Sequence, residues 1–275
     1  MKTRLIPVMM MAIGVLTSAF AADDGKQQDT RVEANGLRIV KPAPGGNDKM
    51  RAFNWNAGTA LALLINRPQG GIVEFEKDSS KVLSFTDDKG KDLSKKETKD
   101  RFGSDRAEFG MMPDTSEDGK LCAVEVTAPG TPSKGATAIT VSGQIGLLVA
   151  TQKKDFTAEK VDLKFDTAVS AGAIPFKITQ VGKPEWGGSD NAFSVTLEAK
   201  QDLQSVADIQ FFDAEGKNLG ATRGGSQKMG FGGNVVESQS FNFKTKVDTA
   251  RIVITYWTDM KKVSVPFKVV TGVGL

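Results

Sequence analysis

The sequence predicts an all-β protein built from two tandem sandwich domains. Three observations support this fold class: apolar and polar residues alternate in short segments, turn-forming residues separate the segments, and two motifs occur twice in the same order. Alternation with a period of two is typical of strands that have one buried face. The sequence shows no sustained helical periodicity, which argues against an α/β protein with helical crossovers.

The alternating segments are distributed over both halves of the chain. We expect strands at residues 37–40, 60–65, 72–75, 82–85, 121–126, 138–149 and 161–165, and then at 174–181, 193–199, 209–212, 240–243, 251–257 and 263–270. Clusters of Gly, Pro, Asp and Asn separate these segments at the short spacing that is typical of a sandwich or barrel.

The N-terminus has the pattern of a secretory signal peptide. Lys2 and Arg4 precede an apolar run over residues 5–16, and a small-x-small triplet follows at residues 19–21. The apolar run is shorter than the ~20 residues that span a hydrocarbon core. We therefore expect cleavage before Ala22, export to the periplasm or the extracellular space, and a mature chain without a transmembrane segment.

Composition excludes several classes of function. Loss of Lys2 and Arg4 with the signal peptide lowers the formal net charge from +3 to +1, which gives no electrostatic basis for nucleic-acid binding. The chain has no His, so Ser-His-Asp triads, Cys-His dyads and ordinary zinc sites are excluded. Cys122 is the only cysteine, so an intramolecular disulfide is excluded too, and strand alternation predicts a buried thiol. We predict that the protein is not an enzyme and holds no cofactor.

Two motifs occur twice in the mature chain. Residues 41–48 and 183–190 share the pattern K-P-x-x-G-G-x-D, and residues 85–93 and 211–219 share F-x-D-x-x-G-K-x-L. The shared order indicates an internal duplication. The first copy has additional residues between its two motifs, which we expect in a surface loop around residues 68–80.

The duplication predicts the domain organisation. We expect a signal peptide at residues 1–21, a polar tail at 22–34, a first β-sandwich at 35–165, a linker at 166–173 and a second β-sandwich at 174–275. Each copy then has about 100–140 residues, the usual size of an immunoglobulin-like sandwich. A single continuous barrel is the alternative.

The chain resembles secreted bacterial proteins that have tandem immunoglobulin-like domains and no characterised activity. The resemblance covers most of the mature chain and rests on the signal peptide, the two repeated motifs and the segment from Tyr256 to Leu275. It implies architecture only, because these motifs carry no known chemistry. The Cys-Trp-Cys signature of antibody domains is missing, which leaves the strand topology open.

The repeated motifs contain carboxylates that superficially resemble calcium ligands. Residues 87–92 and 213–218 place carboxylates beside a glycine, but their spacing differs from that of the EF-hand loop. A hairpin turn explains the same residues, because Gly supplies positive φ and Asp bonds nearby amides. Asp48 and Asp190, which end the other motif, are explained in the same way. We predict turns at these places and no metal site.

A glycine-rich, basic segment runs from Thr222 to Asn234. It lacks the pattern of a phosphate-binding loop. Because long loops on a rigid scaffold commonly carry binding residues, we predict partner contacts at Trp186, Arg223, Lys228 and Phe231. The structural alternative is that the two aromatic residues pack at a sandwich end or domain junction.

Three hypotheses for function follow. The first is an exported, non-catalytic binding or structural module of the cell envelope that contacts a protein or glycan through domain-end loops. The second is a carbohydrate-binding or calcium-dependent adhesion module, in which Trp55 and Trp257 would stack on sugar rings. The third, an enzyme that works without His, has no support beyond abundant Ser, Lys and Asp.

Overall fold

The described part of the chain is all-β, as the sequence predicts. The computed structural model describes residues 30–43, 50, 56–95, 105–110, 113–184, 190–231 and 234–273. Within these ranges there is no α-helix, and so no helix long and apolar enough to cross a membrane. The strands are β1 (Arg31–Val40), β2 (Gly58–Asn66), β3 (Ile72–Asp87), β4 (Glu108–Phe109), β5 (Asp114–Thr115), β6 (Leu121–Ala128), β7 (Ala138–Val149), β8 (Lys153–Asp162), β9 (Ala168–Ser170), β10 (Pro175–Gly182), β11 (Phe193–Ala199), β12 (Val206–Phe212), β13 (Thr222–Phe231), β14 (Asn234–Phe243), β15 (Thr249–Trp257) and β16 (Lys261–Gly272).

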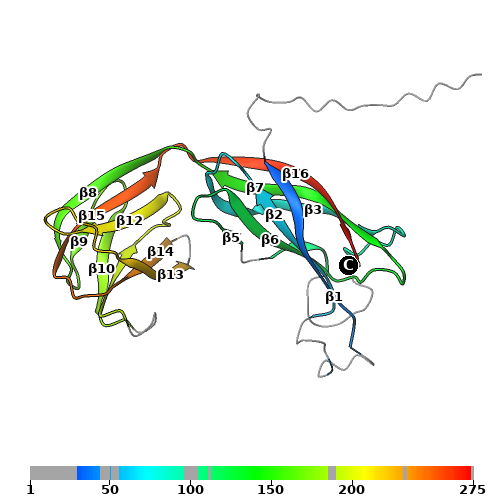
Figure 1. The fold of residues 1–275 in the computed structure, drawn as a ribbon, viewed down its shortest axis with the longest axis horizontal. Coiled ribbons are helices and arrows are strands. Elements are labelled where there is room, and N and C mark those ends of the chain that lie inside the picture. Colours follow the sequence, from blue (N-terminus) through cyan, green and yellow to red (C-terminus); the bar gives the residue numbers. More distant parts are fainter. Residues whose placement is uncertain are drawn as a thin grey trace, which may run out of the picture.

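The strands form two lobes that lie side by side (Figure 1). The first lobe, made of β1–β7 and β16, has one sheet of order β1-β2-β6-β4, with β5 also paired to β6, and one of order β16-β7-β3. The second lobe, made of β8–β15, has sheets of order β13-β14-β11-β10-β9 and β12-β15-β8. Each pair of sheets encloses its own hydrophobic core, so each lobe is sandwich-like.

The two lobes repeat the same strand arrangement, and their turn motifs have the same hydrogen bonds. The main-chain N–H of Lys91 donates to Asp87 Oδ1 (2.8 Å), and that of Lys217 donates to Asp213 Oδ1 (2.7 Å). The glycine of each motif has positive φ, +82° in the first copy and +86° in the second. The prediction of turns at these two places is confirmed.

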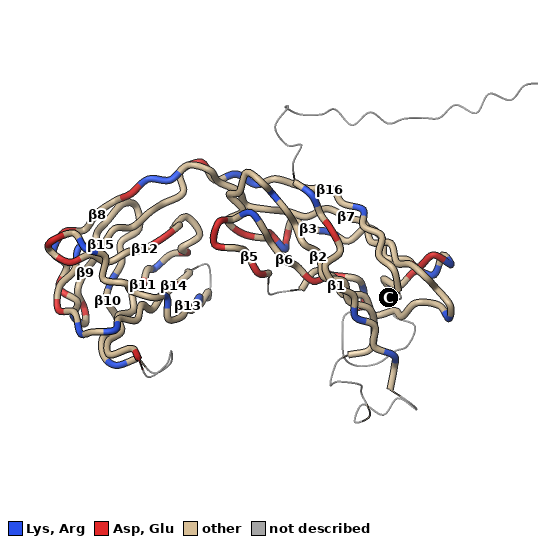
Figure 2. The backbone as a smooth tube through the Cα atoms, viewed as in Figure 1, with Lys and Arg blue, Asp and Glu red and all other residues tan. Residues whose placement is uncertain are grey.

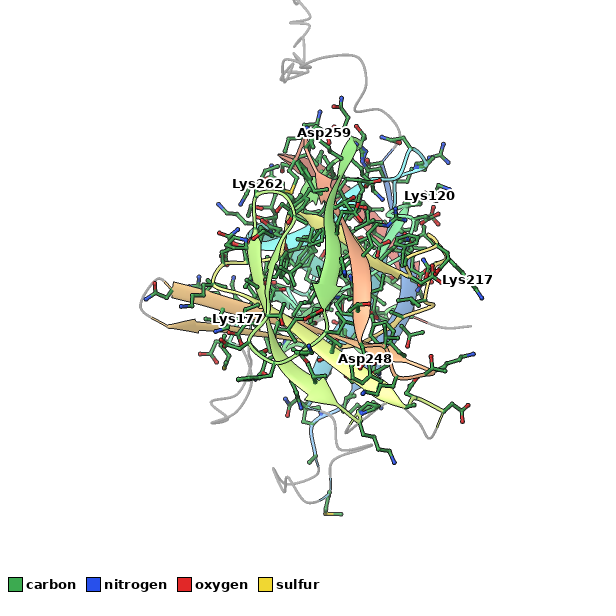
Figure 3. The ribbon with its side chains drawn as sticks, turned by 90° about the vertical axis from the view of Figure 1, so that its left-hand side faces the viewer. Lys120, Lys177, Lys217, Asp248, Asp259 and Lys262 are labelled. Carbon is green, nitrogen blue, oxygen red and sulfur yellow. The ribbon has the colours of Figure 1, made fainter. Side chains whose placement is uncertain are left out.

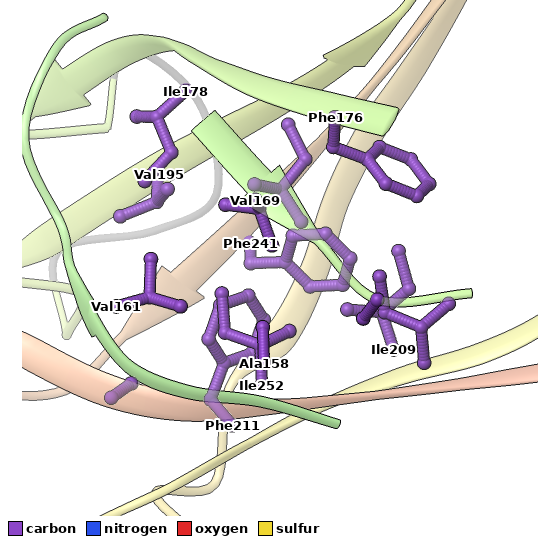
Figure 4. Close-up of a cluster of buried hydrophobic side chains, with 14 of the residues drawn as sticks. Ala158, Val161, Val169, Phe176, Ile178, Val195, Ile209, Phe211, Phe241 and Ile252 are labelled. Carbon is purple, nitrogen blue, oxygen red and sulfur yellow. The ribbon is translucent and has the colours of Figure 1, made fainter. Parts of the chain in front are cut away.

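The last strand of each repeat joins the other lobe. β8 follows β7 in the sequence, yet it pairs with β15, and its Val161 lies in the second core among Phe211 and Ile252 (Figure 4). β16 follows β15, yet it pairs with β7 along 12 residues and contributes Phe267 to the first core. The two repeats therefore exchange their final strands within one chain, as separate molecules do in domain swapping.

The starts of β8 and β16 support their equivalence. β8 begins with Lys153-Lys154 and β16 with Lys261-Lys262, and each pair closely follows a Thr. The predicted domains, 35–165 and 174–275, would assign β8 to the first core and β16 to the second, whereas the structure places them the other way round. The physical reason is that alternation shows one face of a strand to be buried but does not show which sheet the strand joins.

Two short crossings, residues 150–152 and 258–260, connect the lobes. Asp259 lies at this place (Figure 3), and its Oδ1 accepts hydrogen bonds from the main-chain N–H groups of Thr151 (2.8 Å) and Gln152 (2.9 Å). These bonds, foremost the one from Gln152, lower the pKa of Asp259 to about 2. Neither crossing contains the Gly that the tightest hairpin turns favour.

Three elements differ from the sequence prediction. The glycine-rich Thr222–Phe231 is edge strand β13, because pairing with β14 satisfies the main-chain groups on that side without any need for side chains. β1 begins at Arg31, inside the predicted polar tail 22–34, because Val32 and Ala34 pack against the first core. β3 has 16 residues and β12 has 7, so extra residues of the first copy lengthen a strand in place of a loop.

Cys122 has the environment that alternation predicts. It is fully buried on β6 with Val124 and Val126, in the first core. Burial raises the pKa of its thiol, which keeps the group protonated and unreactive in the folded protein.

Candidate functional site

Charged side chains of both signs are distributed over both lobes. Figure 2 shows Lys and Arg interspersed with Asp and Glu along the described strands and turns. Charge therefore does not single out one face of the described surface, and a site has to be located by geometry.

A polar pocket lies on the second lobe, over strands β10, β11, β13 and β14. Its volume is about 150 Å³, and it is lined by Gln180, Gly182, Lys183, Pro184, Ser194, Gly224, Gly225, Ser240 and Asn242. Pockets for drug-sized ligands usually have roughly 300–1,000 Å³. The pocket therefore fits a single small ring or polar group.

Strand alternation places the polar lining on the outer face of the larger sheet. In β11, Ser194 precedes the core residue Val195, and in β14, Asn242 follows the core residue Phe241. Successive side chains of a strand point to opposite faces. The register aligns Gly182 with Ser194 and Ser194 with Asn242, so these residues of three neighbouring strands lie in one row and the glycine leaves space beside Ser194.

Asn242 is the most informative residue of the pocket. The residue is only 4% exposed, and its side-chain amide makes no hydrogen bond to the described residues but reaches the solvent that fills the pocket. A Cβ at Gly224 would lie 2.8 Å from Asn242 Nδ2, so a glycine at this position leaves room beside the amide. The amide is therefore available to a ligand that enters the pocket.

Two further polar side chains of the lining are free to bind. Gln180 on β10 and Ser194 on β11 also make no side-chain hydrogen bonds within the described part of the chain. Ser240, in contrast, pairs with the Thr196 hydroxyl at 2.9 Å. Lys183 contributes an exposed ammonium group, and the described lining contains no carboxylate.

The first lobe has different residues at the equivalent positions. Alignment of the repeated motif and the strand registers places Gly58 where the second lobe has Ser194, and Pro129 where it has Asn242. A Cβ at Gly58 would clash with the carbonyl oxygen of Ala128. The polar set of the pocket therefore belongs to the second repeat, and the shared fold does not require it.

Two of the predicted binding residues, Arg223 and Lys228, lie on β13 and face away from the pocket. The side-chain amide of the buried Gln239 is oriented with its oxygen toward the Arg223 guanidinium. This oxygen accepts a hydrogen bond from Arg223 Nη2 (2.9 Å). Lys228 Nζ lies 3.8 Å from Glu237 Oε2. Both cations therefore have partners within the protein, and their predicted contact with a binding partner stays a prediction.

The prediction of partner contacts is not tested at any of the four residues. Trp186 lies outside the described residues, and of Phe231 the structure describes only the main chain, at the end of β13. Of the tryptophans proposed to stack on sugars, Trp55 lies outside the described residues, and Trp257 has Lys153 Nζ 4.3 Å above its ring.

The carboxylate of Asp87, in the first turn motif, is hydrogen-bonded to main-chain N–H groups of the protein. It accepts main-chain hydrogen bonds from Ser133 (2.7 Å), Lys91 (2.8 Å) and Lys89 (3.0 Å). Burial alone would raise its pKa, but these bonds outweigh burial and hold the pKa at about 2. Within the described ranges, no three potential ligands from His, Cys, Asp or Glu are grouped closely enough to hold a metal ion.

Comparison of the chain with protein-family models, curated proteins and solved structures finds no match. Its function therefore has to be inferred from the geometry of its own residues.

Proposed function

We propose that the protein is an exported, non-catalytic binding module of the cell envelope, and that its second lobe binds the ligand in the polar pocket. Export rests on the signal-peptide pattern of residues 1–21. Two facing sheets around each core, repeated in tandem, support the assignment to tandem immunoglobulin-like domains.

The observation that carries the proposal is the Asn242 amide, which faces the pocket and makes no hydrogen bond to the described residues. A polar group that faces a pocket without a protein partner can donate to and accept from a ligand there. The equivalent place in the first repeat is taken by Pro129, so the sandwich forms without an amide there. A ligand that pairs with Asn242 explains why one repeat has the amide and the other does not.

Capture from an envelope extract tests the proposal. The mature chain, residues 22–275, is immobilised, and retained proteins and glycans are identified by mass spectrometry. Ser194→Trp fills the pocket and is expected to abolish retention of the specific component. Ser238→Ala is the matched control, because Ser238 lies on the same strand as Asn242 but does not line the pocket.

A second variant separates the pocket from the site predicted from the sequence. Arg223→Ala combined with Lys228→Ala removes both cations from the opposite face of β13 and is expected to leave retention unchanged. If this double variant abolishes retention and Ser194→Trp does not, the binding surface is the other face and the pocket proposal is refuted. Circular dichroism establishes that each variant is folded.

A further inference from the structure

We propose that the pocket binds an acidic saccharide, with the sugar hydroxyls on Gln180, Ser194 and Asn242 and the acidic group at Lys183. This ligand class rests on the proposed function, because it assigns the chemistry of the same site.

The free groups of the pocket match the hydroxyls of a sugar. An amide offers two donors and an acceptor, and a serine hydroxyl both donates and accepts. Gln180, Ser194 and Asn242 come from three neighbouring strands and meet around one volume of about 150 Å³. A ligand with several hydroxyls on one small ring pairs with all three, whereas an anion would pair only with the donors and a cation only with the acceptors.

The wall of the pocket argues against an apolar ligand. Small-molecule pockets are usually lined predominantly by hydrophobic and aromatic side chains. Among the described lining residues, Pro184 is the only one with an apolar side chain larger than hydrogen. Recognition must therefore come from hydrogen bonds, which favours a polyhydroxylated ligand.

Charge favours a saccharide with an acidic group. Lys183 is the charged residue of the described lining, and no carboxylate there competes for its ammonium group. Because Lys183 is exposed, solvent screens its attraction, and its contribution to affinity is small. We expect Lys183 to select between charged and neutral forms of the sugar, while the amides provide most of the affinity.

The experiment is a calorimetric titration of the mature chain with a hexuronic-acid disaccharide and with its methyl ester, which lacks the negative charge and carries one additional methyl group. The acid is expected to bind roughly two- to fivefold more tightly than the ester. Lys183→Met should remove this difference and leave the affinity for the ester unchanged. Equal affinities for acid and ester in the wild type would refute the role of Lys183.

Asn242→Leu tests the amide with two readouts. Affinity for the disaccharide should fall roughly tenfold, as expected for loss of the hydrogen bonds of one amide. The melting temperature should change little, because the amide makes no hydrogen bond to the described part of the protein that the variant would remove. If the melting temperature falls and the affinity does not, the amide is structural and the proposal is wrong. Ser238→Ala should change neither quantity.

The outcomes also separate the ligand class from the proposed function. If neither disaccharide binds, while capture from the envelope extract still depends on Ser194, the pocket is a binding site and the saccharide is the wrong ligand. If a disaccharide binds and Ser194→Trp binds it equally well, the sugar site lies elsewhere and this inference fails. Gly224→Ala, which places a methyl group against the Asn242 amide, should weaken saccharide binding without unfolding the lobe.

Discussion

Substitution of Phe267 near the C-terminus should destabilise the lobe that begins near the N-terminus. Phe267 lies on β16, is 8% exposed, and packs edge-on against Phe109 of the first lobe with 6.2 Å between ring centroids. Removal of a buried Phe side chain costs about 3–5 kcal/mol. A domain of this kind has roughly 5–15 kcal/mol of stability in total, so Phe267→Ala should bring the first lobe close to unfolding at room temperature.

Hydrogen exchange followed by mass spectrometry locates the damage. In Phe267→Ala, amide protection should fall in β2 and β7 and remain in β11 and β14. Val161→Ala on β8 is the reciprocal variant, and it should lower protection in β12 and β15 by roughly 1–2 kcal/mol while β2 and β7 keep theirs. If Phe267→Ala instead opens the second lobe, or both variants open the same lobe, the inferred exchange of final strands is incorrect.

Three further predictions follow from the turns, the crossings and the strand order. Because hydrogen bonds lower the folded-state pKa of Asp87, its carboxylate stabilises the fold above about pH 4, and this contribution is lost as the pH falls toward about 2. Asp87→Asn should therefore lower the free energy of unfolding by about 1–2 kcal/mol at neutral pH, and urea titrations should show the gap closing in acid; a gap independent of pH would contradict this. Asp259→Asn should lower the melting temperature at neutral pH. The difference from the wild type should disappear as the pH falls toward about 2, where the wild-type carboxylate becomes protonated and loses its charge. An unchanged melting temperature at neutral pH would show that the carboxylate does not hold the crossings. A fragment of residues 153–257 contains every strand of the second lobe and should melt cooperatively by circular dichroism, whereas residues 30–152 should not, because they lack β16.

The sequence predicts the strands well because a strand with one buried face has alternating apolar and polar residues. The segments at 138–149 and 193–199 agree with β7 (Ala138–Val149) and β11 (Phe193–Ala199) at both ends. The exchange of the final strands has no corresponding pattern in the sequence. A strand with alternating burial fits the edge of either smaller sheet, and only the shared Lys-Lys at the starts of β8 and β16 indicates that the two are equivalent.

The pocket was missed for a related reason. In an alternating strand, a polar residue such as Ser194 or Asn242 is normally assigned to the solvent face, so the pattern gives no sign of a pocket. The sequence instead predicts partner contacts on the basic, glycine-rich segment that forms β13. The structure shows intramolecular partners for its residues Arg223 and Lys228. The sequence does not show that Pro129 is the equivalent of Asn242. This equivalence becomes visible only when the strands of the two repeats are aligned.

The connection of the strands also fixes the order in which the lobes become complete. In topological terms, the second lobe is an insertion between β7 and β16 of the first, and β8–β15 follow one another without interruption. A chain that emerges from its N-terminus can close the second lobe while the first still has an unpaired edge along β7. Such an edge readily pairs with other chains. The first part of the protein to be synthesised is therefore the last to be protected from aggregation.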